Sequence, residues 1–222
     1  GVIVPPQTYW PEIQRICDQH EILLVADEVI TGFGRMGDWF ASETYNLKPD
    51  FIPFAKGVTS GYLPLGGLLV SDRVADVIIS KGGEFTHGFT YSGHPAACAV
   101  AIATINFIER ETILATVKDQ TAPYLKKQWE SLINHDLVGE TRIKGMVAAI
   151  ELSKEGRERY AATIGVGSIC RDLAMDHGIV MRAVGDTMII APPLIINAQQ
   201  IDELMDKIKN TLDATLKTIQ SL

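Results

Sequence analysis

The chain is poor in the residues that build cross-linked, metal-bound or membrane-spanning proteins. It has only three cysteines among 222 residues, and they stand far apart at Cys17, Cys98 and Cys170. Each lies in an apolar, helix-like pattern, which indicates buried thiols in a reducing compartment. No stretch approaches the roughly 18 uncharged apolar residues that a membrane-spanning helix needs. These absences predict a cytoplasmic protein without disulfides, a metal site or a membrane partner.

Positive charge is also scarce. The chain has 20 basic and 27 acidic residues, a formal net charge of -7, and no long basic block. Because nucleic acids and anionic membranes bind clustered Lys and Arg, neither partner is expected. Residues 1–6 lack the basic start of a secretory signal. His87 and His94 stand near each other, but no acidic or cysteine cluster completes a set of metal ligands around them.

Short apolar runs separated by Gly/Pro-rich loops predict an α/β fold in the first half. Residues 11–20 have the apolar spacing of a short amphipathic helix. Residues 22–26, 51–55 and 66–70 are apolar runs of strand length. The run at 22–26 is continuous and does not alternate, which predicts a strand that is covered on both faces.

The pattern of the second half predicts helices packed around a small sheet. A helical pattern between residues 94 and 134 is interrupted by charges at 109–111, and we place a domain boundary there. Residues 1–110 are expected to form an α/β domain, and residues 111–222 a connecting helix and a smaller α+β domain. The elements expected in the second domain are a strand at 146–152, a helix at 164–177 that Gly178 ends, a hairpin around Gly185-Asp186, and a last helix with a capping box between Asn197 and Gln200.

Lys56 and Asp27 have the clearest chemical implication. Lys56 lies between an apolar run and a Gly/Pro-rich loop, and Asp27 ends an earlier apolar run. A lysine beside apolar neighbours loses hydration of its ammonium, which lowers its pKa and makes available the neutral amine that attacks aldehydes. A carboxylate at a strand end can keep a pyridine nitrogen protonated. The pair predicts a pyridoxal 5'-phosphate site; the plainer alternatives are a solvated loop lysine and an aspartate that caps a backbone N–H.

Four ordered motifs strengthen this interpretation and together span essentially the whole chain. They are residues 23–35, residues 48–57, residues 88–95 and residues 181–194. In these motifs the chain resembles the class III aminotransferases, a fold-type I pyridoxal-phosphate family, and it is most similar to the ω-amino acid or amine:pyruvate transaminases. The resemblance implies part of a large mixed or parallel-sheet domain followed by a smaller C-terminal α+β domain.

The resemblance also implies that the chain corresponds to the C-terminal half of the family's chain. Residues 1–110 would then be the second part of the large cofactor-binding domain. An upstream half would carry the Gly/Ser phosphate cup and the aromatic ring that stacks on the cofactor. The alternative is that the chain is complete and simply compact.

By the same resemblance, Lys56 forms the Schiff base with the cofactor and later moves the substrate proton. Asp27 faces the pyridine nitrogen. Val29 lies two residues beyond Asp27, on what is expected to be the same strand face, and would pack against the ring plane. Glu28 is expected to brace the site without taking part in the reaction.

Thr90 and Arg182 are the two remaining candidates. Thr90 lies in a glycine-flanked loop whose hydroxyl and backbone N–H groups can receive a phosphate. In similar enzymes this loop reaches the neighbouring subunit's site, which implies a homodimer. Arg182 suits bidentate capture of a substrate carboxylate. The alternatives are an ordinary turn residue for Thr90 and a salt bridge to Asp186 for Arg182.

The resemblance implies transfer of an amino group from an ω-amino acid or amine donor to a keto-acid acceptor, pyruvate. Another class III reaction, such as that of an aminomutase, racemase or decarboxylase, is an alternative, because the cofactor chemistry is shared. A non-catalytic fragment or assembly module that needs an N-terminal half is a further alternative. We expect the 222-residue chain alone to bind the cofactor poorly and to be inactive.

Overall fold

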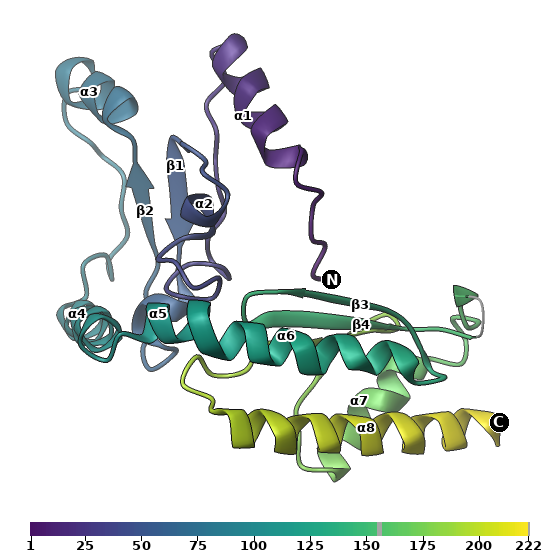
Figure 1. The fold of residues 1–222 in the computed structure, drawn as a ribbon. Coiled ribbons are helices and arrows are strands. Elements are labelled where there is room, and N and C mark those ends of the chain that lie inside the picture. Colours follow the sequence, from purple (N-terminus) through teal and green to yellow (C-terminus); the bar gives the residue numbers. More distant parts are fainter. Residues whose placement is uncertain (155–156, 222) are drawn as a thin grey trace. The chain divides into compact units, whose positions relative to one another are not determined.

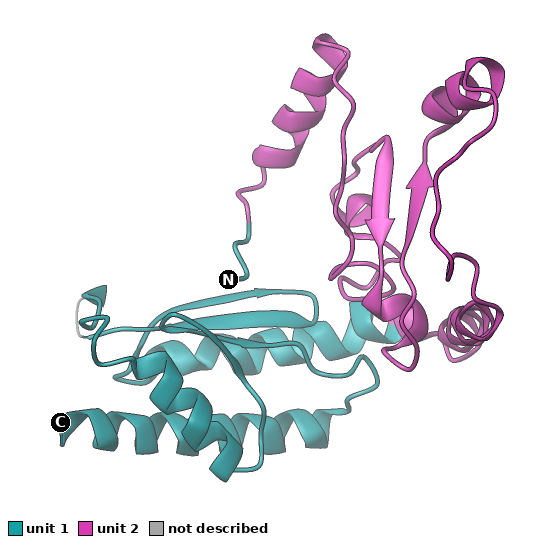
Figure 2. Cartoon of the chain, turned by 180° about the vertical axis from the view of Figure 1, so that it is seen from behind, with its two compact units in different colours: residues 1–4, 116–222 teal, residues 5–115 magenta. Residues whose placement is uncertain are grey.

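The chain divides into two compact units. A computed structural model describes residues 1–154 and 157–221. One unit consists of residues 5–115, and the other combines residues 1–4 with residues 116–222 (Figure 2). The units are defined by backbone packing alone, so the division into a cofactor domain at 1–110 and a small domain at 111–222 stays a prediction.

The unit of residues 5–115 alternates helices with short strands (Figure 1). It contains two helices before the first strand, α1 (Tyr9–Gln19) and α2 (Ala41–Thr44). The strands are β1 (Phe51–Phe54) and β2 (Gly67–Val70), with the 3-10 helix η1 (Lys56–Thr59) between them. The helices that follow are α3 (Asp72–Lys81), α4 (Pro95–Arg110) and the short α5 (Ile113–Thr116), which crosses the division between the units.

Strand β1 lies at the centre of a small mixed sheet. It pairs antiparallel with β2, with Phe51 opposite Val70. It also pairs in parallel with the preceding extended segment: Val25 forms a bridge with Phe51, and the Glu28 N–H donates to the Pro53 carbonyl at 3.0 Å. This mixed pairing agrees with the α/β class predicted from the sequence.

The predicted burial of residues 22–26 is wrong for this structure. Leu23 is 49% exposed and Val25 is 57% exposed, although both belong to a continuous apolar run. A strand is covered on both faces only when other layers pack on each face. Within the described residues the sheet consists of β1, β2 and the bridge at Val25, so these side chains stay in contact with solvent.

A small aromatic and aliphatic cluster holds this unit together. Phe33, Val58, Ala101 and Ile108 are buried, and Phe54 packs against them from β1. The Phe33 and Phe54 rings lie 5.6 Å apart in an edge-to-face arrangement. The cluster therefore fastens helix α4 to the turn that contains η1.

The second unit contains the four-stranded sheet and, among the described residues, the longest helix. Its first elements are the π-helix η2 (Val117–Thr121), α6 (Ala122–Glu130) and the 3-10 helix η3 (Ser131–Asn134). Strands β3 (Val138–Lys144) and β4 (Val147–Leu152) follow, then α7 (Val166–Asp176). The unit ends with β5 (Arg182–Val184), β6 (Thr187–Ile190) and α8 (Ala198–Gln220).

Its four strands form one antiparallel sheet in the order β3-β4-β6-β5. The side chains of Ala148, Ile150 and Met188 alternate onto one face and are fully buried. Helix α6 is tied to the sheet by a hydrogen bond from Trp129 Nε1 to the Ala149 carbonyl at 3.1 Å. The predicted α+β arrangement and the hairpin around residues 185–186 are confirmed.

Helix α8 begins as the sequence predicts. Asn197 accepts a hydrogen bond from the Gln200 N–H at 2.9 Å, and the Gln200 side chain accepts one from the Asn197 N–H at 3.0 Å. This reciprocal pair is a capping box. At the end of α7, Gly178 has a φ of +73°, as expected for a helix stop. Across the described residues, no helix combines the length and the apolar character that a bilayer crossing requires.

Candidate functional site

Asp27 and Lys56 follow two extended segments that run side by side in the same direction. The Ala26 N–H donates to the Phe51 carbonyl at 2.9 Å, and the Glu28 N–H to the Pro53 carbonyl at 3.0 Å. Lys56 begins η1 just beyond β1. Because parallel segments end at the same sheet edge, both residues lie at the carboxyl-terminal edge, where ligands bind in open α/β sheets.

Asp27 is exposed and turns the chain away from the sheet. Its Oδ1 accepts a hydrogen bond from the Val29 N–H at 3.0 Å. This local bond, two residues along, is typical of an Asx turn. The expectation that Val29 continues the same strand face is therefore wrong, because the chain is already turning at Val29. The capping role considered for Asp27 is present, and Oδ2 has no hydrogen bond within the described part of the chain.

Lys56 is exposed and starts a tight turn. Its φ is +46°, in the left-handed region that residues with a Cβ seldom adopt. The expected dehydration by apolar neighbours is not found, since the side chain reaches solvent. Its ammonium makes no ion pair or hydrogen bond with any residue that the structure describes. The amine is thus unpaired at the sheet edge.

Thr90 lies in the exposed loop between α3 and α4. The loop is closed locally, because Ser92 Oγ accepts a hydrogen bond from the Phe89 N–H at 3.1 Å and the Ser92 N–H donates to the Phe89 carbonyl. Over the described residues, no hydrogen bond or ion pair links Thr90 to Asp27 or Lys56. A phosphate-binding role for Thr90 stays a prediction.

Arg182 opens strand β5 in the other unit and is exposed. It pairs with Ile189 of β6. The alternative of a salt bridge to Asp186 is not found: Asp186 Oδ1 accepts a hydrogen bond from the Gly167 N–H at 2.9 Å, and no ion pair of Arg182 exists within the described residues. The guanidinium is therefore available to a carboxylate.

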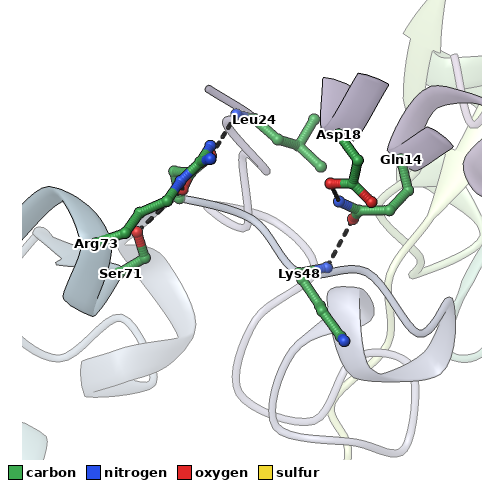
Figure 3. A network of polar contacts seen from close by, with 7 residues as sticks. Gln14, Asp18, Leu24, Lys48, Ser71 and Arg73 are labelled. Carbon is green, nitrogen blue, oxygen red and sulfur yellow. Dashed lines mark hydrogen bonds and ion pairs between the residues drawn. The ribbon is translucent and has the colours of Figure 1, made fainter. Parts of the chain in front are cut away.

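Asp50 is a key residue that the sequence did not single out. It is 5% exposed and directly precedes β1. Its carboxylate accepts hydrogen bonds from the Leu24 N–H at 2.9 Å, from Ser71 Oγ at 3.0 Å and from two nitrogens of Arg73 at 2.5 and 2.6 Å. Figure 3 shows Arg73 and Ser71 converging beside the backbone of Leu24. One side chain thus joins the extended segment, β1 and the start of α3.

The Arg73 hydrogen bonds lower the pKa of Asp50 to about 2, from an ordinary value of 3.8, although burial of the carboxyl opposes the shift. Asp50 is consequently ionised throughout the physiological range. The Asp50 and Phe51 N–H groups both donate to the Leu24 carbonyl, at 2.7 and 3.1 Å. This fixes the register of the two segments that lead to Asp27 and Lys56.

A hollow of about 330 Å³ lies beside this network, at the opposite end of the paired segments from Asp27 and Lys56. Gln14 lines it, and its side chain binds Asp18 and accepts from the Lys48 N–H at 2.9 Å (Figure 3). These groups are already paired with one another. Among residues 1–154 and 157–221, no cluster of three or more His, Cys, Asp and Glu side chains could hold a metal ion.

Comparisons with known proteins give a consistent result. The family model described as aminotransferase class III matches residues 1–212. Putrescine–pyruvate aminotransferase of Pseudomonas aeruginosa is 54% identical over 221 residues, covering 99% of this chain and 48% of that protein. Chloroplastic gamma aminobutyrate transaminase 3 of Solanum lycopersicum is 38% identical, covering 100% of this chain and 44% of that protein.

Solved structures agree. A transaminase from the marine bacterium Virgibacillus superposes with a TM-score of 0.94 at 38% identity, covering 99% of this chain and 51% of that one. An (S)-enantioselective omega-transaminase from Thermomicrobium roseum gives a TM-score of 0.92 at 39% identity, with coverages of 97% and 48%. The chain spans about half the length of the curated relatives it matches.

Proposed function

The chain belongs to the class III aminotransferase family, and from this premise we propose that the protein carrying it transfers an amino group from an ω-amino acid or amine to pyruvate, with pyridoxal 5'-phosphate as cofactor. The choice of donor and acceptor is supported by the 54% identity to a putrescine–pyruvate aminotransferase. Arg182 supports an amino-acid donor, because a free guanidinium can bind a carboxylate through two hydrogen bonds.

The observation that carries the proposal is the chemistry of the groups at the sheet edge. Lys56 has an amine without a partner in the described structure, and Asp27 has a free carboxylate oxygen at the same edge. An aldehyde requires such an amine, and a protonated pyridine nitrogen requires such a carboxylate. The residues present therefore fit the cofactor.

When bound, pyridoxal phosphate supplies an electron sink for the charge that develops on the substrate carbon. In the proposal, Asp27 keeps a proton on the pyridine nitrogen. Lys56 Nζ would hold the cofactor's aldehyde carbon and, once the substrate amine has replaced it there, would act as the base that moves the substrate proton. Val29 would pack beside the ring from the turn after Asp27, the Thr90 hydroxyl would donate to the phosphate, and Arg182 would bind the substrate carboxylate.

The proposal includes a homodimer in which the exposed loop of Thr90 serves the neighbouring subunit's site. It also places the protein in the cytoplasm. The three cysteines are unpaired, and Cys170 is buried, as suits a reducing compartment.

Chemical trapping on Lys56 tests the proposal. The full-length protein loaded with pyridoxal phosphate is reduced with borohydride, digested, and mapped by mass spectrometry. We expect one labelled peptide, with the label on Lys56, and none in the Lys56→Arg variant. Lys48→Arg, at another exposed lysine, is the control and should label as the wild type does. A label elsewhere, or no label, contradicts the proposal.

The reaction itself is tested by incubating the protein with pyruvate and either β-alanine or putrescine. We expect formation of alanine with at least one of these donors. No alanine with any donor would favour a different class III reaction, such as that of an aminomutase, racemase or decarboxylase.

A further inference from the structure

Glu28 is a buried carboxylate that the proposed reaction does not use. It is 2% exposed, whereas its neighbour Asp27 is exposed. Its oxygens accept hydrogen bonds from Thr31 Oγ1, from the Ala41 N–H at 2.9 Å and from the Ser42 N–H at 2.6 Å. A buried carboxylate is stable only when such donors replace the water it loses.

These bonds close the loop of residues 28–42 on itself. The Gly32 N–H donates to the Glu28 carbonyl at 2.9 Å, so backbone and side chain of Glu28 both hold the loop. At the other side of the loop, the Phe33 N–H donates to the Trp39 carbonyl at 2.6 Å. The loop is therefore held in one conformation, and the side of the loop that contains the buried residues Gly32 and Phe33 is its inner surface.

The inner surface of this loop lies directly against the turn of Lys56. A Cβ on Gly57 would come within 3.1 Å of the Gly32 carbonyl oxygen and within 3.1 Å of Phe33 Cβ. Phe33 also belongs to the buried cluster that contains Val58. The residue that follows Lys56 is thus in close contact with the loop that Glu28 holds.

Lys56 needs such support. Its φ of +46° is disfavoured for a residue with a Cβ, and conformations of this kind persist when the surroundings enforce them. Backbone bonds within the turn include one from the Gly61 N–H to the Lys56 carbonyl at 3.2 Å and one from the Ser60 N–H to the Gly57 carbonyl at 3.0 Å, but neither comes from outside the turn. The direction in which the Lys56 side chain leaves the backbone depends on this turn.

From these contacts we infer that Glu28 is a positioning residue: through the loop of residues 28–42 it holds the turn that aims the Lys56 amine at the edge where Asp27 lies. The inference rests on the proposed function for the identity of the aldehyde that the amine meets. The other half of the inference, that Glu28 keeps the turn at Lys56 ordered, does not depend on any ligand.

The test uses the full-length protein and the variants Glu28→Gln and Thr31→Val. The first replaces one carboxylate oxygen with an NH₂ group, which then faces a backbone N–H donor, because the Ala41 and Ser42 N–H groups bind different oxygens of Glu28. The second removes one hydroxyl donor and is the milder change. Glu43→Gln is the matched control, because Glu43 is an exposed carboxylate in the same region that accepts one backbone N–H, from Trp39 at 3.0 Å.

Two measurements are made. Hydrogen exchange of peptides that cover residues 54–62 reports how well ordered the turn is, and it needs no cofactor. The rate of borohydride trapping on Lys56 reports whether the Lys56 amine is positioned to react with the cofactor. We expect Glu28→Gln to speed exchange in residues 56–61 and to slow trapping, each by about tenfold or more. Thr31→Val should act in the same direction with a smaller effect, and Glu43→Gln should match the wild type.

The inference is overturned if exchange of residues 56–61 is unchanged in the folded variants, if exchange rises while trapping keeps the wild-type rate, or if Glu43→Gln has the same effect. Should Glu28→Gln not fold, Thr31→Val decides. If the wild-type protein takes no label on Lys56, the proposed function fails, and the exchange measurement still decides whether Glu28 orders the turn.

Discussion

Adjacent acidic residues in this chain have opposite environments. Asp27 is exposed with one free oxygen, whereas Glu28 is buried among N–H and O–H donors. Glu151 shows a third arrangement: burial acts to raise its pKa, but hydrogen bonds from Thr187 and Arg142 outweigh burial, and the net shift is downward. The role of each carboxylate is set more by the groups that donate hydrogen bonds to it than by its place in the sequence.

Asp50 should make stability depend on pH. The pKa of its carboxyl is about 2 in the folded chain and near 3.8 when unfolded, so its contribution is complete above about pH 4 and is lost as pH falls towards 2. We expect Asp50→Asn to lower the free energy of unfolding at pH 7 by roughly 1–2 kcal/mol, reduced by solvent screening at the half-exposed Arg73. Urea unfolding at pH 7 and at pH 3 measures this difference.

The difference in unfolding free energy between wild type and Asp50→Asn should narrow at pH 3, because the unfolded wild type is then largely protonated at Asp50 while the folded chain keeps most of this charge. Glu12→Gln is the control, since Glu12 forms an exposed ion pair with Arg15. Its free energy of unfolding should match that of the wild type at both pH values, because solvent screens an exposed ion pair. A gap for Asp50→Asn that is the same at both pH values contradicts the expected role of its charge.

Single contacts also decide where helices begin. Helix α7 starts against the hairpin of β5 and β6: a Cβ on Gly167 would lie 2.0 Å from the Gly185 carbonyl oxygen, and Asp186 binds the Gly167 N–H. Glycine is required there by the close approach of two backbones. Helix α8 instead starts with a local signal, the capping box.

Asn197→Ala should destabilise the unit of residues 116–222 by about 1 kcal/mol, because the substitution leaves the Gln200 N–H without its acceptor. Chemical unfolding followed by circular dichroism measures the loss. Gln199→Ala changes an exposed residue in the same turn and should leave the unfolding midpoint unchanged. Equal effects of the two substitutions would argue against the capping box as a source of stability.

At the scale of the whole chain, apolar strand residues remain exposed. Leu23, Val25, Leu68 and Leu69 are between 44% and 57% exposed, although their sequence pattern is that of buried strands. Because successive side chains of a strand point to opposite faces, Leu68 and Leu69 leave apolar surface exposed on both faces of β2. The chain spans about half the length of the curated relatives it matches, so the proposed activity is that of the protein that carries this chain.

The isolated 222-residue chain should consequently bind pyridoxal phosphate weakly. Lys56 and Asp27 are present, but within the described residues their sheet edge is open to solvent, so little surface surrounds a bound ring. Calorimetric titration of the isolated chain, with the full-length protein as the reference, measures the affinity. Tight binding of one cofactor per isolated chain would refute this prediction.

Local patterns predicted much of the fold. The helix of residues 11–20 is α1, the strand at 51–55 is β1, and the capping box at Asn197 is present. Strand β3 and helix α3 escaped prediction. Strand β3 contains charged residues, among them Glu140 and Arg142, which form an ion pair. These charges interrupt the alternation of apolar and polar residues by which a strand is recognised in a sequence.

Motif order and residue type need no coordinates, and they were enough to identify the family and to make Lys56 and Asp27 the candidate cofactor residues. The folded chain was needed to find that Asp50 joins three segments and that Glu28 holds the loop beneath Gly57. Both findings depend on groups far apart in the sequence that meet at hydrogen-bond or contact distance, and no local pattern encodes that distance.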